Sequence, residues 1–529
     1  MIKLLFYAFT TIRGVKTWNL RTRDTKTFSN SNGHKVTNVA DNIDINYYLE
    51  DKVTYLTRKD WKTYPKNYTN VTTGNGIQKE QPFRLADSPK KDEWIKELRN
   101  LQYVPTTDKP TENINGIIPE DVGEGKEYKT PWEWITSFKL RNPKAFDDVN
   151  SDIWNQYAAA MDINEAAGAI LHGGNTTDTL SVGNPTSAQS ESVAGYSQQL
   201  TIIPAETEDG VATKMVLNVA SNTLLGSSFN PELALEWGKI EGEGGLWLQD
   251  ETKKGTITVW GAGLNLHRHA YNGRNSEYMS EDPMLTNRIG EAQIKGAMSK
   301  GAIVGPKHMG FNDQELNRQG NAAYMTEQKM RETDIRCYEG ALRKEEGNGN
   351  GVMMSFSRIG ATNVTNHTGL IIDLLREEWS FDGIISTDMG MKWYHEPYSI
   401  INATINQYAG FGANDSFIGK DGKDMSDDAC DKTWDYVTMK VLKNDSYLCE
   451  KARETNKYQH FTLAHSANVN IRLAEEGEEG ETQILDVYLG EIDHAPWEYI
   501  FISVTSVSAV FTALTGAAWI ASSLIRKEN

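Results

Sequence analysis

Three short segments place charged side chains directly after runs that predict β-strands. Asp388 ends the run that begins at Ile384, Lys307 and His308 follow the string GAIVGP, and Arg274 lies beyond TITVWGAGLNL. In a (β/α)8 barrel, active sites lie at the carboxyl ends of the strands, so this is where functional side chains are expected. The pattern predicts a basic cluster and a carboxylate arranged around a polar ligand.

The spacing of these residues leaves structural interpretations open. A lone Asp at the end of a strand is commonly a turn or helix-cap residue. A Lys-His pair after a strand commonly lies on the surface, and an Arg near several acids commonly makes a structural ion pair. Spacing alone therefore supports only a generic site.

The elements that would position these side chains follow one another in an alternating pattern. From about Asn150 the sequence alternates strand-like and helix-like segments, which is typical of βα units. TITVWGAGLNL and GAIVG predict strands, residues 228–248 and 324–344 predict helices, and LLREEWSFDGIISTD predicts a helix, a turn and a strand. Residues 1–150 are polar and predict irregular, extended structure, either a small β module or a wrapping arm.

Charge and composition exclude several classes of protein. The chain of 529 residues has 54 Lys and Arg against 72 Asp and Glu, a net charge of −18, which argues against a nucleic-acid partner. Its three cysteines exclude a disulfide scaffold or a Cys-rich zinc module. The histidines show no zincin-type motif and there is no Walker phosphate loop. We expect no metal site and no organic cofactor.

The C-terminal end predicts a single membrane span. The 27 residues from Tyr499 to Ile525 carry no charge, and about 20 apolar residues are enough to cross a bilayer. Arg526 and Lys527 follow, so the positive-inside rule predicts that the rest of the chain is extracytoplasmic. The alternative is a buried core helix. The N-terminal string MIKLLFYAFTTI makes a poor signal peptide, so export depends either on this segment or on sequence upstream of Met1.

Several longer strings together resemble one enzyme family. GRNSEYMSEDP, KHMGFNDQELNRQG and SFDGIISTDMG, in that order, resemble glycoside hydrolase family 3 of the β-glucosidase type, and the likeness runs from about Trp132 to Asn468. The string from Ile45 to Trp61 resembles the stretch before the barrel in circularly permuted, membrane-anchored members. The resemblance implies a (β/α)8 barrel over 132–473. Composition and charge predict an irregular or β-rich N-terminal region over 1–131, such as a small β module, an acidic linker over 474–496 and a transmembrane anchor over 497–527.

The resemblance also implies a role for each candidate residue. Family 3 enzymes are retaining hydrolases, and the Asp in the position of Asp388 is their nucleophile, which forms a covalent glycosyl-enzyme that water then hydrolyses. Arg274, Lys307 and His308 occupy the positions of sugar-hydroxyl contacts. His308 would hold either Asp388 or a sugar hydroxyl, and the sequence does not decide between them.

The chain departs from the family in two places. The early barrel of the family carries an Asp-Gly-Pro-like motif that grips sugar hydroxyls, whereas SVGNPTSAQSESVAG offers Glu191 instead, which we retain as a substrate-binding candidate. The general acid/base is not identifiable, because the sandwich domain that supplies it in many members does not fit in the residues before the barrel. A separate domain or chain would then supply it.

Two classes of function follow from these observations. The leading hypothesis is a membrane-anchored, extracytoplasmic hydrolase that cleaves non-reducing-end β-linked sugars and uses no cofactor. The alternative is a catalytically impaired glycan-binding protein that keeps a degenerate barrel, or a fragment that needs a separate acid/base domain.

Overall fold

A computed structural model of the chain divides it into two compact units, residues 1–469 and 470–529. The second unit lies outside the residues that the structure describes. The described residues are 27–29, 35–50, 85–99, 103, 115–171, 179–185, 187, 189–191, 202–203, 214–215, 220–252, 258–268, 270, 272–312, 315, 318, 322–389, 397–409 and 445–466.

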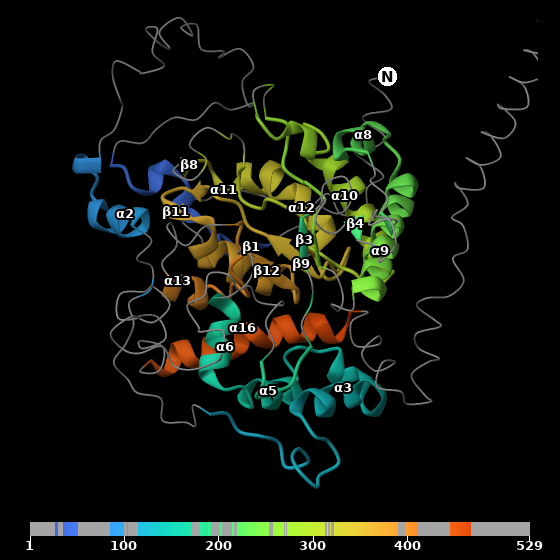
Figure 1. Cartoon of the computed structure of the whole chain (residues 1–529). Coiled ribbons are helices and arrows are strands. Elements are labelled where there is room, and N and C mark those ends of the chain that lie inside the picture. The colour runs from blue at the N-terminus through green and yellow to red at the C-terminus, as the bar shows by residue number, and fades with distance from the viewer. Residues whose placement is uncertain are drawn as a thin grey trace, which may run out of the picture. The chain divides into compact units, whose positions relative to one another are not determined.

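The first unit mixes helices and strands along its whole described length (Figure 1). The strands are β1 (Thr27–Ser29), β2 (Lys35–Thr37), β3 (Gln189–Glu191), β4 (Ile202–Ile203), β5 (Lys214–Met215), β6 (Thr258–Trp260), β7 (Ile303–Val304), β8 (Ala322–Ala323), β9 (Gly351–Met353), β10 (Arg358–Ile359), β11 (Thr362–Asn363) and β12 (Ile384–Ser386). The α-helices are α2 (Lys91–Leu98), α3 (Pro131–Arg141), α4 (Pro143–Phe146), α5 (Asp152–Ala159), α6 (Ile163–Leu171), α8 (Asn222–Ser227), α9 (Pro231–Thr252), α10 (Pro283–Met298), α11 (Glu327–Lys329), α12 (Arg336–Leu342), α13 (Pro397–Asn402) and α16 (Ser446–Ala464). The 3-10 turns are η1 (Asp41–Ile43), η2 (Ile45–Tyr47), η4 (Leu85–Asp87), η6 (Asn275–Glu277) and η8 (Val364–Asn366), and the π-helical segments are η7 (Met330–Asp334) and η9 (Gly369–Glu378).

Five strands form the parallel centre of this unit and follow one another in chain order. β3, β6 and β7 pair in parallel, and so do β9 and β12. Met353 N donates to Pro306 O at 3.0 Å, which joins β9 to the segment after β7. Thr387 N donates to Gln407 O at 3.0 Å, and the Gln189 side chain donates to the Gln407 side chain at 3.1 Å. The segment at Gln407 therefore lies against both β12 and β3.

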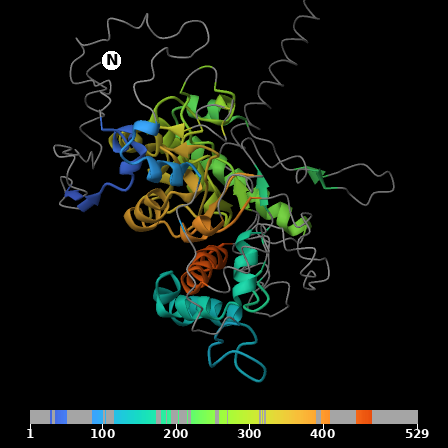
Figure 2. The ribbon, with the colours of Figure 1, turned by 90° about the vertical axis from the view of Figure 1, so that its left-hand side faces the viewer.

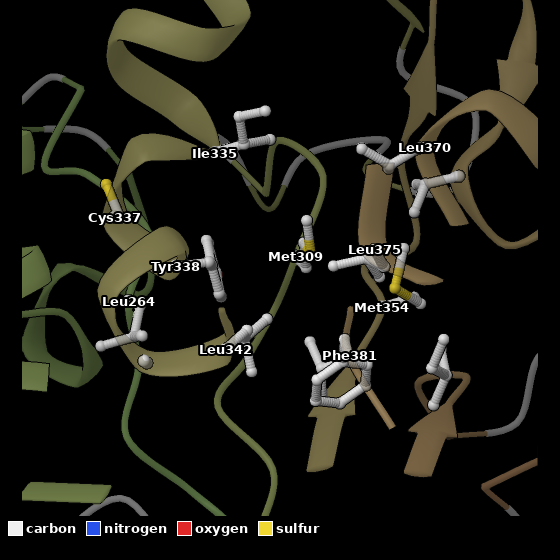
Figure 3. Close-up of a cluster of buried hydrophobic side chains, with 14 of the residues drawn as sticks. Leu264, Met309, Ile335, Cys337, Tyr338, Leu342, Met354, Leu370, Leu375 and Phe381 are labelled. Atoms are coloured by element: carbon white, nitrogen blue, oxygen red, sulfur yellow. The ribbon is translucent and has the colours of Figure 1, made fainter. Parts of the chain in front are cut away.

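The core lies around these strands because their residues are buried on both faces. Every residue of β6, β7, β9 and β12 is buried, as expected for parallel strands covered by helices. Val352 and Ile385 belong to one large cluster of buried apolar side chains. Figure 3 shows part of it, including Leu370 and Leu375 of η9 and Phe381. The run LLREEWSFDGIIS thus supplies a covering helix, a turn and a strand, as the sequence predicts.

The helix before the Lys307 strand has clear sequence causes. Asp282 caps α10 by accepting hydrogen bonds from the N–H groups of Met284 and Leu285, both at 2.8 Å, and Pro283 occupies its first turn. α10 packs on α9, where Gly238 allows close contact: a Cβ there would lie 1.8 Å from Gln293 O. The predicted helix over 228–248 is α9, which begins at Pro231 and ends at Thr252.

The last described helix packs on the early helices of the unit. Residues of α6 and α16 form a second buried cluster that includes Ile163, Ile170 and Leu448. Figures 1 and 2 show α16, in red, beside the teal helices in both views. Asn406 Nδ2 donates to Thr455 O at 2.6 Å and ties α16 to the loop after α13.

The described N-terminal residues differ from the irregular or β-rich region that the sequence predicts. β1 and β2 form an antiparallel pair, but α2 and α3 are helical, because each has an acidic first turn, and α3 also has Pro131 at its start. Val39 and Ala40 donate their N–H groups to the Glu327 carboxylate, both at 3.2 Å, and join the main core cluster. The segment from 38 to 49 is thus a packed part of the unit.

Within the described part of the chain, no helix is both long enough and apolar enough to cross a membrane. The predicted span over 497–527 and the predicted acidic linker over 474–496 lie outside the described residues.

Candidate active site

The structure brings Asp388, Lys307 and His308 to the carboxyl ends of two strands of the parallel centre. Asp388 follows β12, and Lys307 and His308 follow β7, which precedes β9 in the parallel order. His308 Nε2 lies 3.6 Å from Asp388 Oδ2. Arg274 is the residue before η6, and its positive charge acts on both Asp388 and His308. These four residues therefore form one site, and whether they perform the roles that the family resemblance implies remains a prediction.

Asp388 is a buried carboxylate with one oxygen engaged. Its side chain is almost fully buried, and Oδ1 accepts a hydrogen bond from Met389 N at 2.7 Å. Oδ2 has no hydrogen-bond partner among the described residues. Thr387 Oγ1 donates to Asp388 O at 2.9 Å and accepts from Ala409 N at 3.0 Å, which fixes the backbone here. One oxygen of the carboxylate is thus engaged, and the other is buried without a partner among the described residues.

Burial controls the ionisation of this carboxylate. Desolvation raises the pKa of Asp388 from its ordinary value of 3.8 to about 6. The Met389 N–H and then the positive charges of Arg318, Arg274 and Lys307 oppose this rise. At neutral pH the carboxylate is therefore mostly ionised, as a nucleophile requires, and it titrates within the physiological range.

His308 is completely buried, and its backbone is held by hydrogen bonds to the Asn265 side chain. Burial, with the nearby charges of Arg274 and Lys307, keeps the pKa of His308 well below its usual value, so the ring is neutral at pH 7. His308 N donates to Asn265 Oδ1 at 2.6 Å, and Asn265 Nδ2 donates back to His308 O at 2.8 Å. This pair of bonds fixes the backbone from which the ring projects.

Lys307 and Arg274 supply positive charge in different ways. Lys307 is completely buried, and its carbonyl accepts from Leu264 N at 2.8 Å. Arg274 donates two hydrogen bonds to Glu277, at 2.7 and 2.6 Å, and its Nε lies 3.7 Å from Glu315. Burial acts against the charge of Arg274, but the bonds to Glu277 keep its pKa above the usual value. Arg274 is therefore a fixed cation at the site.

Glu191 ends β3, the strand that pairs in parallel with β6. Its backbone lies opposite that of Trp260, while its side chain is outside what the structure describes. Its predicted contact with substrate therefore stays a prediction.

Sequence reasoning missed four residues of this site. Arg318 lies with its guanidinium 4.1 Å from the Phe356 ring centre and pairs with Glu315 at 3.4 Å. The other three are buried polar residues around His308: Asn265, Tyr278 and Asn312. Asn265 lies near the end of the string TITVWGAGLNL, which predicts a strand, so its position was a usable signal. Tyr278 contacts His308 and Asn312 contacts Tyr278, and no local pattern reveals these two contacts.

The described residues hold no group of three or more His, Cys, Asp or Glu side chains placed to bind a metal ion. Cys337 and Cys449 are both buried free thiols, and burial raises the pKa of each. Neither cysteine lies in the loops that carry the site.

Residues 144–407 match the sequence profile described as the glycosyl hydrolase family 3 N-terminal domain. The matched segment contains every strand of the parallel centre and the candidate residues Arg274, Lys307, His308 and Asp388. The chain belongs to glycoside hydrolase family 3.

Two curated relatives illustrate the likeness. A β-glucosidase of Bacteroides ovatus is 30% identical over 209 residues, which cover 37% of this chain and 27% of that protein. An exo-α-(1→6)-L-arabinopyranosidase of Bifidobacterium longum is 31% identical over 182 residues, covering 34% of this chain and 23% of that protein. The chain thus matches about a quarter of the length of these relatives.

A solved structure, a β-glucosidase from Paenibacillus barengoltzii, also resembles the chain. The two share 21% sequence identity and a TM-score of 0.48, over 71% of this chain and 36% of the other.

Proposed function

We propose that this protein is a retaining glycoside hydrolase that acts on non-reducing-end β-linked sugars, with Asp388 as its nucleophile. The observation that carries the proposal is the state of Asp388, a buried carboxylate with one unpartnered oxygen beside cationic side chains at the end of a parallel strand. Membership of family 3 and the β-glucosidase named among the curated relatives support it.

The proposed reaction has two steps. The Asp388 carboxylate attacks the anomeric carbon, the glycosidic oxygen leaves with a proton from a general acid, and a covalent glycosyl ester remains. Water then attacks the same carbon, loses its proton to the residue that acted as acid, and releases the sugar and the Asp388 carboxylate. Lys307 and Arg274 would donate hydrogen bonds to sugar hydroxyls, which strengthen as charge develops.

The general acid is assigned to a domain or chain outside the described residues. Glu315 is an acidic residue close to Lys307 in the sequence, but its oxygens pair with Arg274 at 3.7 Å and with Arg318 at 3.4 Å. These contacts suit a residue that holds two arginines in place. Acid assistance contributes roughly 10²–10⁴-fold, so this chain alone would act mainly on substrates with activated leaving groups.

The parallel order of strands supports a (β/α)8 barrel over residues 132–473 as the proposed architecture. β3, β6, β7, β9 and β12 follow in sequence, and Gln407 lies against both ends of the series. We also retain the anchor over 497–527 and an extracytoplasmic catalytic unit as proposals, on the strength of the uncharged run. Membrane fractionation of the whole chain and of a chain ending at residue 496 tests the anchor, and equal membrane retention would refute it.

Turnover of an activated aryl β-glucoside by the Asp388→Ala variant tests the proposed activity. We expect a loss on the order of 10³-fold or more, because no other group replaces the nucleophile. Asp382→Ala is the matched control, since this carboxylate lies in the turn before the same strand and pairs with Lys344. Unchanged turnover in Asp388→Ala would sink the assignment, and sugar binding without turnover in the wild type would favour the glycan-binding alternative.

A further inference from the structure

The two ring nitrogens of His308 face different partners. Nδ1 lies 3.4 Å from the hydroxyl of Tyr278, whereas Nε2 lies 3.6 Å from Asp388 Oδ2. Across the described chain, neither Nε2 nor Oδ2 makes a hydrogen bond. A neutral imidazole carries one proton, so its position decides whether an N–H or a lone pair faces the carboxylate.

The hydroxyl of Tyr278 is oriented from its other side. Asn312 Nδ2 donates a hydrogen bond to the Tyr278 oxygen at 2.8 Å, which leaves the hydroxyl hydrogen free to be donated. Tyr278 is completely buried, and its ring meets the His308 ring edge-on with centroids 6.3 Å apart. Nδ1 of His308 is the acceptor within reach of that hydrogen. A hydroxyl that donates to Nδ1 requires the imidazole proton to sit on Nε2.

The charge of Asp388 favours the same tautomer. A lone pair on Nε2 would face an ionised carboxylate oxygen, which is repulsive in a buried site, whereas an N–H there is attractive. The two bonds between the Asn265 side chain and the His308 backbone hold the backbone from which the ring projects. Tyr278 thus contacts the ring itself, Asn312 orients the Tyr278 hydroxyl, and Asn265 holds the His308 backbone.

We propose that Tyr278 is a positioning residue that fixes the Nε2–H tautomer of His308, so that a hydrogen-bond donor faces Oδ2 of Asp388. The role in catalysis rests on the proposed hydrolase function, but the tautomer itself does not. Without the Tyr278 hydroxyl, part of the His308 population would carry its proton on Nδ1. The lone pair then left on Nε2 would disfavour the ionised form of Asp388.

Nitrogen NMR of the full chain, labelled with ¹⁵N-histidine, measures the tautomer directly. The sequence has 10 histidines, and the signals that vanish in His308→Gln identify the pair from this ring. We expect an N–H on Nε2 and an unprotonated Nδ1 in the wild type, and a mixture or reversal in Tyr278→Phe. A protonated Nδ1 in the wild type, or an unchanged tautomer in Tyr278→Phe, would overturn the inference.

Tyr157 and His460 provide a matched control. The Tyr157 hydroxyl lies 3.0 Å from His460 Nδ1, both residues are buried, and His460 Nε2 lacks a described partner as His308 Nε2 does. Tyr157→Phe therefore removes the same contact at a place away from the candidate nucleophile. It should leave the His308 signals unchanged, so an equal effect of both variants on His308 would contradict the proposal.

The pH profile tests the catalytic part. Tyr278→Phe should move the acidic limb of kcat/KM upward by about 0.5–1 pH unit, because ionised Asp388 loses a facing donor. Tyr157→Phe should leave the limb in place. A fall in kcat/KM in Tyr278→Phe with no shift of the limb would indicate a structural role only and overturn the positioning role. If neither the wild type nor the variants hydrolyse glycosides, the proposed function fails, and the NMR result still decides the tautomer.

Discussion

His308 Nε2 lies 3.6 Å from Asp388 Oδ2, and both atoms lack a hydrogen-bond partner in the part of the chain that the structure describes. Buried polar atoms are almost always paired, so two unpaired atoms that face each other mark a place where a further hydrogen bond can form. A substrate hydroxyl or a small approach of the ring would complete the contact. The relationship couples the protonation of one residue to that of the other.

The acidic limb of kcat/KM should lie near pH 6. Burial raises the pKa of Asp388 to about 6, and only the ionised carboxylate attacks, so the rate should fall as the pH drops through that value. A profile on an activated aryl glycoside isolates this limb, because such a substrate depends little on a proton donor. A limb near pH 4, the ordinary range of an Asp, would contradict the burial of this carboxylate.

Replacing Arg318 by Met should move the acidic limb of the kcat/KM profile to higher pH. Its charge lowers the pKa of Asp388, so its loss should raise the limb by about 0.3–1 unit while activity above pH 8 changes less. Arg141→Met is the control, since this guanidinium also lies over an aromatic ring, 4.2 Å from the Phe138 centroid, but at the exposed C-terminal end of α3. A downward shift in Arg318→Met would show that its charge does not act on Asp388.

Asp388→Asn should stabilise the fold at neutral and alkaline pH. The pKa of the Asp388 carboxyl is 3.8 in the unfolded chain and about 6 in the folded protein. Ionisation therefore costs the folded state about 3 kcal/mol above pH 6 and nothing below pH 3.8. The gain in Tm should therefore be large at pH 8 and small at pH 4. Asp382→Asn, which removes a surface ion pair with Lys344, should change stability by less than about 1 kcal/mol. An equal gain at both pH values would count against a folded-state pKa of about 6 for Asp388.

Two glycine substitutions test the packing that supports the site. Gly238→Ala should destabilise the fold by about 3 kcal/mol, because its Cβ would lie 1.8 Å from Gln293 O on α10. Gly168 lies in α6 with nothing within 4 Å of a built Cβ, so Gly168→Ala should stabilise by about 0.5–1 kcal/mol. Denaturant unfolding compares the two variants, and similar effects would contradict the contact between α9 and α10.

The sequence predicts the local elements of the site better than its contacts. Asp388, Lys307 and His308 each follow a short apolar run, so the strands β12 and β7 and the place of these residues are readable from local pattern. Arg274 lies in the string GRNSEYMSEDP after β6, which marks it through the family resemblance. What local pattern lacks is the pairing of residues far apart: Asn265 with His308 is separated by 43 positions, and Tyr278 with His308 by 30.

The N-terminal region shows a different limit. Its polar composition predicts irregular structure, yet Val39 and Ala40 are buried against Glu327, nearly three hundred residues later. A tertiary partner therefore decides their conformation, and no short window of sequence contains that partner. The π-helical geometry of η7 and η9 is likewise invisible in a pattern that predicts only a helix.

Trapping of the glycosyl-enzyme tests the central claim most directly. A 2-fluoro β-glucoside with a dinitrophenolate leaving group needs a nucleophile but no proton donor, so it applies to this chain alone. Mass spectrometry of the digested protein should find one sugar ester, on the peptide that contains Asp388, and none in Asp388→Ala. A sugar ester on a different residue, or no ester in a wild-type protein that turns over the aryl glucoside, would contradict Asp388 as the nucleophile.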